Sequence, residues 1–193
     1  NLSKIKKAKK KVVVDYGNGT ASLVMPLILK QFGWETISIN PLLDGNFPGR
    51  PSEPTKDNLG ELISRVKSSR ADLGIAFDGD ADRVIFIDER GEFIFGDKTF
   101  ALCVKNKLAG TNGKGNAVVT TIATSRTVED IAKENGAKIV YTKVGEPYLA
   151  ETMAFSSSII MGGEEVGGVI WPELHFGTDG LSTAAKICEY VSE

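Results

Sequence analysis

Three aspartates stand at alternate positions directly after a short apolar run. Residues 73–77 (LGIAF) lead into Asp78-Gly79-Asp80-Ala81-Asp82, and a second apolar run, residues 84–87 (VIFI), follows. Continuous apolar runs of this length, bounded by turn residues, are typical of buried strands. The aspartates are therefore expected in a loop at the carboxyl end of a strand, which is where open α/β sheets bind their ligands. This pattern constrains both the fold class and the position of a site.

The spacing of these carboxylates indicates a cation site. In an extended loop, side chains at alternate positions point the same way, about 6–7 Å apart. Neighbouring carboxylates would then repel each other by about 2–3 kcal/mol at an effective dielectric constant near 20, and a bound cation would offset that repulsion. Asp78, Asp80 and Asp82 offer only oxygen atoms, so the pattern predicts a hard ion, Mg²⁺ or Ca²⁺.

A calcium-binding EF-hand loop has similar spacing. With Asp78 at the first position, Asp80, Asp82 and Glu89 take the third, fifth and twelfth, but the glycine that the sixth requires is Arg83. The flanking runs are strand-like rather than helical, so we reject an EF-hand. We expect Mg²⁺ serving a phosphate group, with Arg83 as a second positive group. A solvated acidic turn is the alternative that the spacing alone leaves open.

Composition excludes several classes of protein. The net charge of −2 over 193 residues creates no global field that favours nucleic acid or membrane. Six lysines lie within residues 4–11, and without interleaved aromatic residues this stretch is expected to be a solvated linker rather than a nucleic-acid arm. The two cysteines lack metal or disulfide spacing, which predicts reduced thiols in a cytoplasmic protein. A start at Asn1 rather than Met suggests a piece of a longer protein.

The chain alternates strand-like and helix-like segments twice over. A strand at 12–15, a glycine turn at 17–19 and a helix over 21–32 form a βα unit, but the turn lacks the third glycine of a dinucleotide-binding fingerprint. A loop over 41–54, stiffened by prolines, is long enough to contact a ligand or a neighbouring domain. A similar series of segments begins near Gly96. We therefore predict two similar three-layer α/β/α domains with mixed, mostly parallel sheets, residues 1–95 and 96–193.

Three further loops carry candidate functional residues. The glycines around Glu164 would let backbone approach a ligand, and the carboxylate of Glu164 could accept hydrogen bonds from sugar hydroxyls, although a plain hairpin turn explains them equally. Lys143 and Glu146 flank a glycine at the end of a predicted strand. Lys143 could contact a phosphate and Glu146 could act as an acid or base, or both could be ordinary surface charges. His175, the single histidine, lacks the nucleophile motif of a hydrolase and is expected to be structural or peripheral.

One string identifies a family by resemblance. ADLGIAFDGDADR at residues 71–83 closely resembles the metal loop of the α-D-phosphohexomutases, the phosphomannomutase/phosphoglucomutase family. VDYGNG at 14–19 is similar to the start of the family's second domain, and TKVG at 142–145 and GEEVGG at 163–168 are similar to active-site loops of its third. The resemblance runs the full length. It implies that the N- and C-terminal domains of such an enzyme are missing from this chain.

The resemblance also implies roles for individual residues. Asp78, Asp80 and Asp82 would hold Mg²⁺ beside an active-site phosphoserine, and Arg83 would contact that phosphate. Lys143 and Glu146 would take part in catalysis. The sugar loop, formed by Gly163, Glu164, Val166 and Gly167, would bind a phosphorylated hexose in two flipped orientations. The implied reaction interconverts hexose 1-phosphate and 6-phosphate through a bisphosphorylated intermediate.

The chain departs from the family pattern in three places. The phosphoserine segment is absent. Thr20-Ala21-Ser22 is similar to its first half, but an apolar helix follows, so Ser22 is not the nucleophile. The fourth, phosphate-gripping domain is absent as well. Val166 stands where the sugar loop usually has Ser or Asn, and Glu146 and Gly168 stand where some members have His.

The sequence leaves two other functions open, and each makes its own prediction. A different Mg²⁺-dependent phosphotransfer enzyme would form an aspartyl-phosphate on Asp78 or Asp80. A non-catalytic sugar-phosphate-binding module would bind its ligand without any missing domain. On the leading hypothesis, the isolated chain has no mutase activity, and the identity of the hexose, whether mannose, glucose or glucosamine, stays undetermined.

Overall fold

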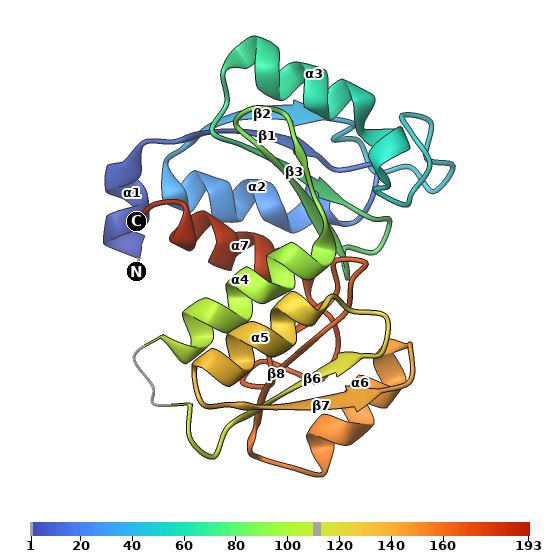
Figure 1. The fold of residues 1–193 in the computed structure, drawn as a ribbon. Helices are drawn as coiled ribbons and strands as arrows, with labels where there is room; N and C mark the ends of the chain where they lie inside the picture. The colour runs from blue at the N-terminus through green and yellow to red at the C-terminus, as the bar shows by residue number, and fades with distance from the viewer. Residues whose placement is uncertain (1, 110–112) are drawn as a thin grey trace. The chain divides into compact units, whose positions relative to one another are not determined.

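The computed structural model describes residues 2–109 and 113–193, and its contacts divide the chain into two compact units. The first comprises Asn1–Ile94 together with Gly180–Glu193, and the second comprises Phe95–Asp179. Each unit contains one mixed sheet with flanking helices (Figure 1). The predicted α/β fold class is confirmed. Within the described residues, no helix is both long and apolar enough to cross a membrane.

The first sheet has the strand order β2-β1-β3-β4-β5. Strand β1 pairs in parallel with β2 and with the central strand β3, whereas β4 is antiparallel to both β3 and β5. The strands are β1 (Lys11–Asp15), β2 (Glu35–Ile39), β3 (Leu73–Phe77), β4 (Val84–Asp88) and β5 (Phe93–Ile94). Every residue of β3 is buried, as its continuous apolar sequence predicts for a strand covered on both faces.

Helices cover both faces of this sheet (Figure 1). One face packs against α3 (Gly60–Ser69), which follows a short 3₁₀ helix (Lys56–Leu59) and buries Leu62 and Val66 against strand residues such as Ile87. The opposite face carries α2 (Ala21–Phe32) and α7 (Gly180–Tyr190). The apolar side of α2, Met25 and Leu29 among it, is buried. The result is the predicted three-layer arrangement.

The lysine-rich start of the chain is a helix, α1 (Leu2–Ala8), and the prediction of a solvated linker was wrong. Ile5, 4% exposed, anchors the helix, and the indole Nε1–H of Trp34 donates a hydrogen bond to the Ile5 carbonyl at 2.8 Å. The lysines of the helix, Lys4, Lys6 and Lys7, are exposed. A single apolar residue within a basic run was too weak a periodic signal to predict a helix, because its partner lies far along the sequence.

The second sheet repeats the start of the first, with the order β7-β6-β8-β9. Its central strand β6 pairs in parallel with β7 and β8, and β9 is antiparallel to β8. The elements are α4 (Gly96–Leu108), β6 (Ala117–Thr121), α5 (Arg126–Glu134), β7 (Lys138–Thr142), α6 (Glu146–Ala154), β8 (Ile159–Gly163) and β9 (Val169–Ile170). The hydroxyl of Ser125 accepts a hydrogen bond from the amide of Thr127 at 3.2 Å and caps α5.

The last helix lies with the first unit rather than with the segment that precedes it in the chain. Helix α7 contacts β4, α2 and α1, and it buries Ala184, Ile187 and Cys188. Its first residue, Gly180, donates its amide to the carbonyl of Ala81 at 3.1 Å. A β-carbon on Gly180 would lie 2.8 Å from that carbonyl oxygen, so the close approach of the two backbones requires glycine.

Candidate metal and phosphohexose site

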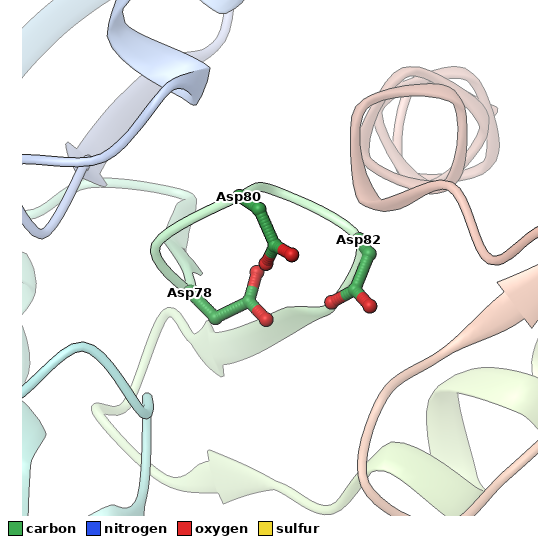
Figure 2. A group of neighbouring side chains, drawn as sticks. All are labelled: Asp78, Asp80 and Asp82. Carbon is green, nitrogen blue, oxygen red and sulfur yellow. The ribbon is translucent and has the colours of Figure 1, made fainter. Parts of the chain in front are cut away.

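The three aspartates converge at the end of β3, as Figure 2 shows. One carboxylate oxygen from each of Asp78, Asp80 and Asp82 lies within 4.8 Å of the other two. Asp78 is buried, Asp82 is half-buried and Asp80 is exposed. The loop is not extended, contrary to the geometry expected from the sequence, because Ala81 adopts a left-handed conformation with φ of 65°. This coiling brings the carboxylates together from positions that a strand would hold further apart.

The electrostatics of this cluster favour a cation. Two carboxylates 4.8 Å apart repel each other by about 3.5 kcal/mol at an effective dielectric constant near 20. The pKa of Asp78 is raised to about 7, chiefly by burial and further by the neighbouring carboxylate of Asp82, while Arg83 acts in the opposite direction. An all-oxygen donor set with one open side suits a hard divalent ion such as Mg²⁺ or Ca²⁺. The residues present therefore fit a metal.

Arg83 links the acidic loop to the proline-rich loop. Its Nε–H donates to Asp78 Oδ2 at 2.9 Å and to Asp82 Oδ1 at 3.3 Å, and one terminal nitrogen donates to the carboxylate of Glu53. The side chain is 31% exposed, so the guanidinium edge meets solvent beside the carboxylates. Five N–H donors give a guanidinium the capacity to hold these carboxylates and a phosphate oxygen together.

A buried ion pair that was not predicted from the sequence fastens the proline-rich loop beside the site. Arg50 and Asp15 have side chains only 5% and 2% exposed, and Arg50 Nε donates to Asp15 Oδ2 at 2.7 Å. The terminal nitrogens of Arg50 donate to the carbonyls of Phe77, Pro51 and Ser52 at 2.6, 2.9 and 3.0 Å. The loop over 41–54 is thereby fastened to the ends of β1 and β3 in its own unit. The one sequence signal was an acid at a strand end and an arginine in a stiff loop.

The glycine turn before α2 also packs on the acidic loop. The amide of Thr20 donates to the carbonyl of Gly79 at 2.9 Å, and a β-carbon on Gly19 would lie 2.6 Å from the same oxygen. Close approach of backbones, rather than contact with a dinucleotide, explains the glycine at position 19. The turn and the acidic loop form one packed edge of the first sheet.

In the second unit, two loops that the sequence singled out meet at Glu164. This side chain, 8% exposed, accepts a hydrogen bond from the amide of Gly145 at 2.9 Å, so the loop after β7 and the loop after β8 are joined. Lys143 lies over the ring of Tyr148, with Nζ 5.6 Å from the ring centroid. Glu146 accepts hydrogen bonds from the amide and the hydroxyl of Thr178, both at 3.1 Å.

The remaining residues of the glycine loop have separate structural explanations. A β-carbon on Gly163 would lie 2.5 Å from the ring of Phe100, and Gly167 has a φ of 99° that side chains rarely adopt. Val166 is 42% exposed. Glu165, the second acidic residue of the glycine-rich loop, accepts hydrogen bonds from the hydroxyls of Thr121 and Thr124 at 3.1 and 3.4 Å.

His175 forms local contacts, in line with the structural role expected for it. Its Nδ1 accepts a hydrogen bond from the amide of Gly177 at 3.0 Å, and its Nε2 lies 3.3 Å from Asp179 Oδ2. The structure thus gathers Asp78, Asp80, Asp82 and Arg83 on the first unit. It gathers the segments of Lys143, Glu146 and Glu164 on the second.

A carboxylate cluster at a strand end, carried by a repeated α/β unit, is typical of α/β proteins that bind their ligands at the carboxyl edge of the sheet, with oxygen ligands suited to a hard cation. Comparison with known proteins narrows this class. Residues 1–91 match the sequence model of a protein family described as "Phosphoglucomutase/phosphomannomutase, alpha/beta/alpha domain II". Residues 95–193 match the model of domain III of the same family. The chain belongs to the phosphoglucomutase/phosphomannomutase family.

Individual relatives agree with this assignment. A phosphoglucomutase/phosphomannomutase of Thermococcus kodakarensis is 49% identical over 98% of this chain, which covers 41% of that protein. A probable phosphoglucosamine mutase of Methanococcoides burtonii is 39% identical over 98% of the chain and 42% of its own length. The crystal structure of a family protein from Burkholderia thailandensis superposes with a TM-score of 0.86 at 27% identity, covering 99% of this chain and 43% of that one. The chain thus spans less than half the length of these relatives.

Proposed function

We propose that this chain forms the two middle domains of a phosphohexomutase, a longer parent protein that interconverts hexose 1-phosphate and hexose 6-phosphate. The convergence of three carboxylate oxygens within 4.8 Å of one another, at the end of β3, is the observation that carries the proposal. In sequence the domains would be residues 1–95 and 96–193, although the last helix of the second, α7, packs within the first compact unit. The substrate would be a phosphorylated mannose, glucose or glucosamine, and the parent would supply the phosphoserine and the C-terminal phosphate-binding domain.

In this proposal the first unit binds the metal and the transferring phosphate. Asp78, Asp80 and Asp82 would hold Mg²⁺, which when bound neutralises charge that develops on the phosphoryl group. Arg83 would contact the same phosphate, and its hydrogen bonds to Asp78 and Asp82 fix the guanidinium for that contact. Positioning and neutralisation account for most of the catalysis of phosphoryl transfer, so these residues need not exchange protons with substrate.

The second unit would bind the sugar. Glu164 would accept hydrogen bonds from sugar hydroxyls, with Gly163, Val166 and Gly167 shaping the loop around it. Lys143 would contact a phosphate. Glu146 would act as the acid or base, and Thr178 holds its carboxylate through two hydrogen bonds.

The parent is proposed to act in the cytoplasm. Buried cysteines in both units, Cys103 and Cys188, suit a compartment that keeps thiols reduced.

Magnesium binding tests the proposal directly on this chain. Titration calorimetry with MgCl₂ should show one site, and Asp80→Asn should abolish it without unfolding the chain, because Asp80 is exposed. Asp57→Asn, an exposed carboxylate on the 3₁₀ helix, is the matched control and should bind as the unaltered chain does. Equal binding by the unaltered chain and by Asp80→Asn would refute the metal site.

Turnover tests the reaction. The chain alone should not convert mannose or glucose 1-phosphate, whereas the parent protein should, and Asp80→Asn in the parent should abolish the conversion. Turnover by the isolated chain would contradict the proposal. A covalent phosphate on Asp78 or Asp80 would instead establish a different Mg²⁺-dependent phosphotransfer enzyme, and tight sugar-phosphate binding by a natural protein of this length would establish a binding module.

A further inference from the structure

One helix of the first unit presents an apolar surface to solvent. On α2, Leu23, Val24 and Leu27 are 61%, 42% and 64% exposed, and Pro26 is exposed between them. We call these four residues the outer face of α2. The opposite side of the helix, with Met25 and Leu29, is buried. Over residues 21–29 the exposed positions of the helix are all apolar, and its exposed polar residues, Lys30 and Gln31, lie in the last turn. A helix segment that is apolar on both sides is typical of one covered on both sides.

The second unit provides an internal comparison. Helix α5 occupies the same place in its sheet, connecting β6 to β7 as α2 connects β1 to β2, and both sheets have these strands paired in parallel. The exposed residues of α5 are all polar: Arg126, Thr127, Asp130, Lys133 and Glu134. The position in the fold therefore does not require an apolar outer surface. Its presence on α2 alone of the pair indicates a partner.

The exposed apolar surface extends past the start of the helix. Leu42 and Leu43 are 77% and 55% exposed. Asn18, in the turn before α2, donates its side-chain amide to the carbonyl of Leu42 at 2.7 Å, and its own carbonyl accepts the amide of Asp44 at 3.0 Å. These bonds hold the two leucines next to the N-terminal end of α2.

The position at which the chain enters the first unit favours a domain ahead of α1 as the partner. The rival occupant is a domain after Glu193, whose side chain lies 3.2 Å from Lys4 Nζ. Helix α1 contacts α2 and α7, and the bond from Trp34 to the carbonyl of Ile5 fastens it there. The relatives are more than twice as long as this chain, and the first part of the chain matches the family's domain II rather than its domain I. A domain joined ahead of α1 would be held beside α2 at a high effective concentration, so a modest apolar surface would suffice to dock it.

We propose that the outer face of α2, with Leu42 and Leu43, is the docking surface for the domain that precedes α1 in the parent protein. The inference rests on the proposed place of this chain within a longer mutase. The six residues are all apolar, and the nearest exposed charge on α2 is Lys30, one turn beyond Leu27; a mainly apolar surface suits a permanent contact between domains of one polypeptide.

Thiol labelling tests this surface. The native cysteines, Cys103 and Cys188, are buried, so a cysteine placed at position 27 would dominate labelling by maleimide in the chain. Leu27→Cys should react rapidly in residues 1–193 and about tenfold or more slowly in the parent, with the site identified by peptide mass spectrometry. Asp130→Cys, on the equivalent exposed surface of α5, is the matched control and should react at the same rate in both proteins.

Equal rates for Leu27→Cys in the two proteins would overturn the inference, as would protection of position 27 that persists in a parent shortened to begin at residue 1. Sedimentation of residues 1–193 gives the second check, since a dimer that Leu27→Glu dissociates, together with slow labelling of Leu27→Cys in residues 1–193, would assign the surface to a second copy instead. Mutase activity is measured separately. A parent that protects position 27 but converts no hexose phosphate would refute the proposed reaction and leave the docking surface in place.

Discussion

The ion pair between Arg50 and Asp15 predicts a large loss of stability for a single substitution at a buried side chain. Replacing Arg50 with Met keeps most of the aliphatic stem but removes the guanidinium. The carboxylate of Asp15, 2% exposed, would then be left without its charge partner, and the carbonyl of Phe77 would lose a donor at 2.6 Å. Removing one partner of a buried pair costs about 3–5 kcal/mol, because the other charge stays buried.

Two features of Asp15 place the expected cost towards the lower end of that range. The carboxylate keeps two donors after the substitution, the amide of Gly17 at 2.8 Å and the side chain of Asn40 at 3.1 Å. The loop over 41–54 would also lose the hydrogen bonds that Arg50 makes, and no new contact would replace them. We expect Arg50→Met to lower the free energy of unfolding of the first unit by about 3 kcal/mol.

Urea unfolding followed by tryptophan fluorescence measures this loss in the correct unit. The chain has two tryptophans, and each compact unit contains one, Trp34 in the first and Trp171 in the second. In a Trp171→Phe background the signal reports the first unit alone. At a slope of about 2 kcal/mol per molar urea, a loss of 3 kcal/mol moves the midpoint down by about 1.5 M.

A matched control separates the buried pair from arginine in general. Arg90, in the same unit, has a side chain 78% exposed, and its Nε lies 3.4 Å from Asp88 Oδ2. Arg90→Met should change the free energy of unfolding by no more than about 0.5 kcal/mol. A loss below about 1 kcal/mol for Arg50→Met, with an unchanged urea slope, would refute the assignment of Arg50 as a buried anchor.

Three further predictions concern the two sites. The folded-state pKa of Asp78 is raised to about 7, so its contribution to stability is present below its unfolded pKa and is lost as pH rises through 7. Without metal, urea unfolding of the first unit should therefore show a loss of stability from pH 5 to 8. Asp78→Asn should flatten that pH dependence. Gly163→Ala should destabilise the second unit by about 1–3 kcal/mol by overpacking against Phe100, measured by the fluorescence of Trp171. Glu164→Ala should remove the acceptor of the Gly145 amide and increase hydrogen exchange at that amide, with a loss of about 1 kcal/mol.

Each of these has a contrary outcome. A pH dependence that persists in Asp78→Asn would assign it to other groups. A Gly163→Ala chain as stable as the unaltered one would mean that the ring of Phe100 moves aside without cost. Unchanged exchange at Gly145 in Glu164→Ala would show that the hydrogen bond does not hold the loop after β7.

The candidate site was predictable as far as its residues are neighbours in sequence. The acidic loop, with Arg83 next to it, follows from an apolar run and the alternation of carboxylates, because burial and strand formation leave a local periodic pattern. The burial of Asp78 and the coiling at Ala81 were not predictable. Both depend on what packs around the loop, including the carbonyl-to-amide contact between Ala81 and Gly180, which are about a hundred positions apart in the chain.

The sequence by itself determined the alternation of strands and helices, the repeated α/β unit, the carboxylate cluster and the glycine-rich loops, since each leaves a pattern within about ten residues. Only the tertiary structure decided that Arg50 is buried on Asp15, that the lysine-rich start is a helix held by Trp34, and that α7 lies with the first unit. These features arise from pairs far apart in the chain. Their energies come from burial and charge pairing in the folded state, and no local periodicity records them.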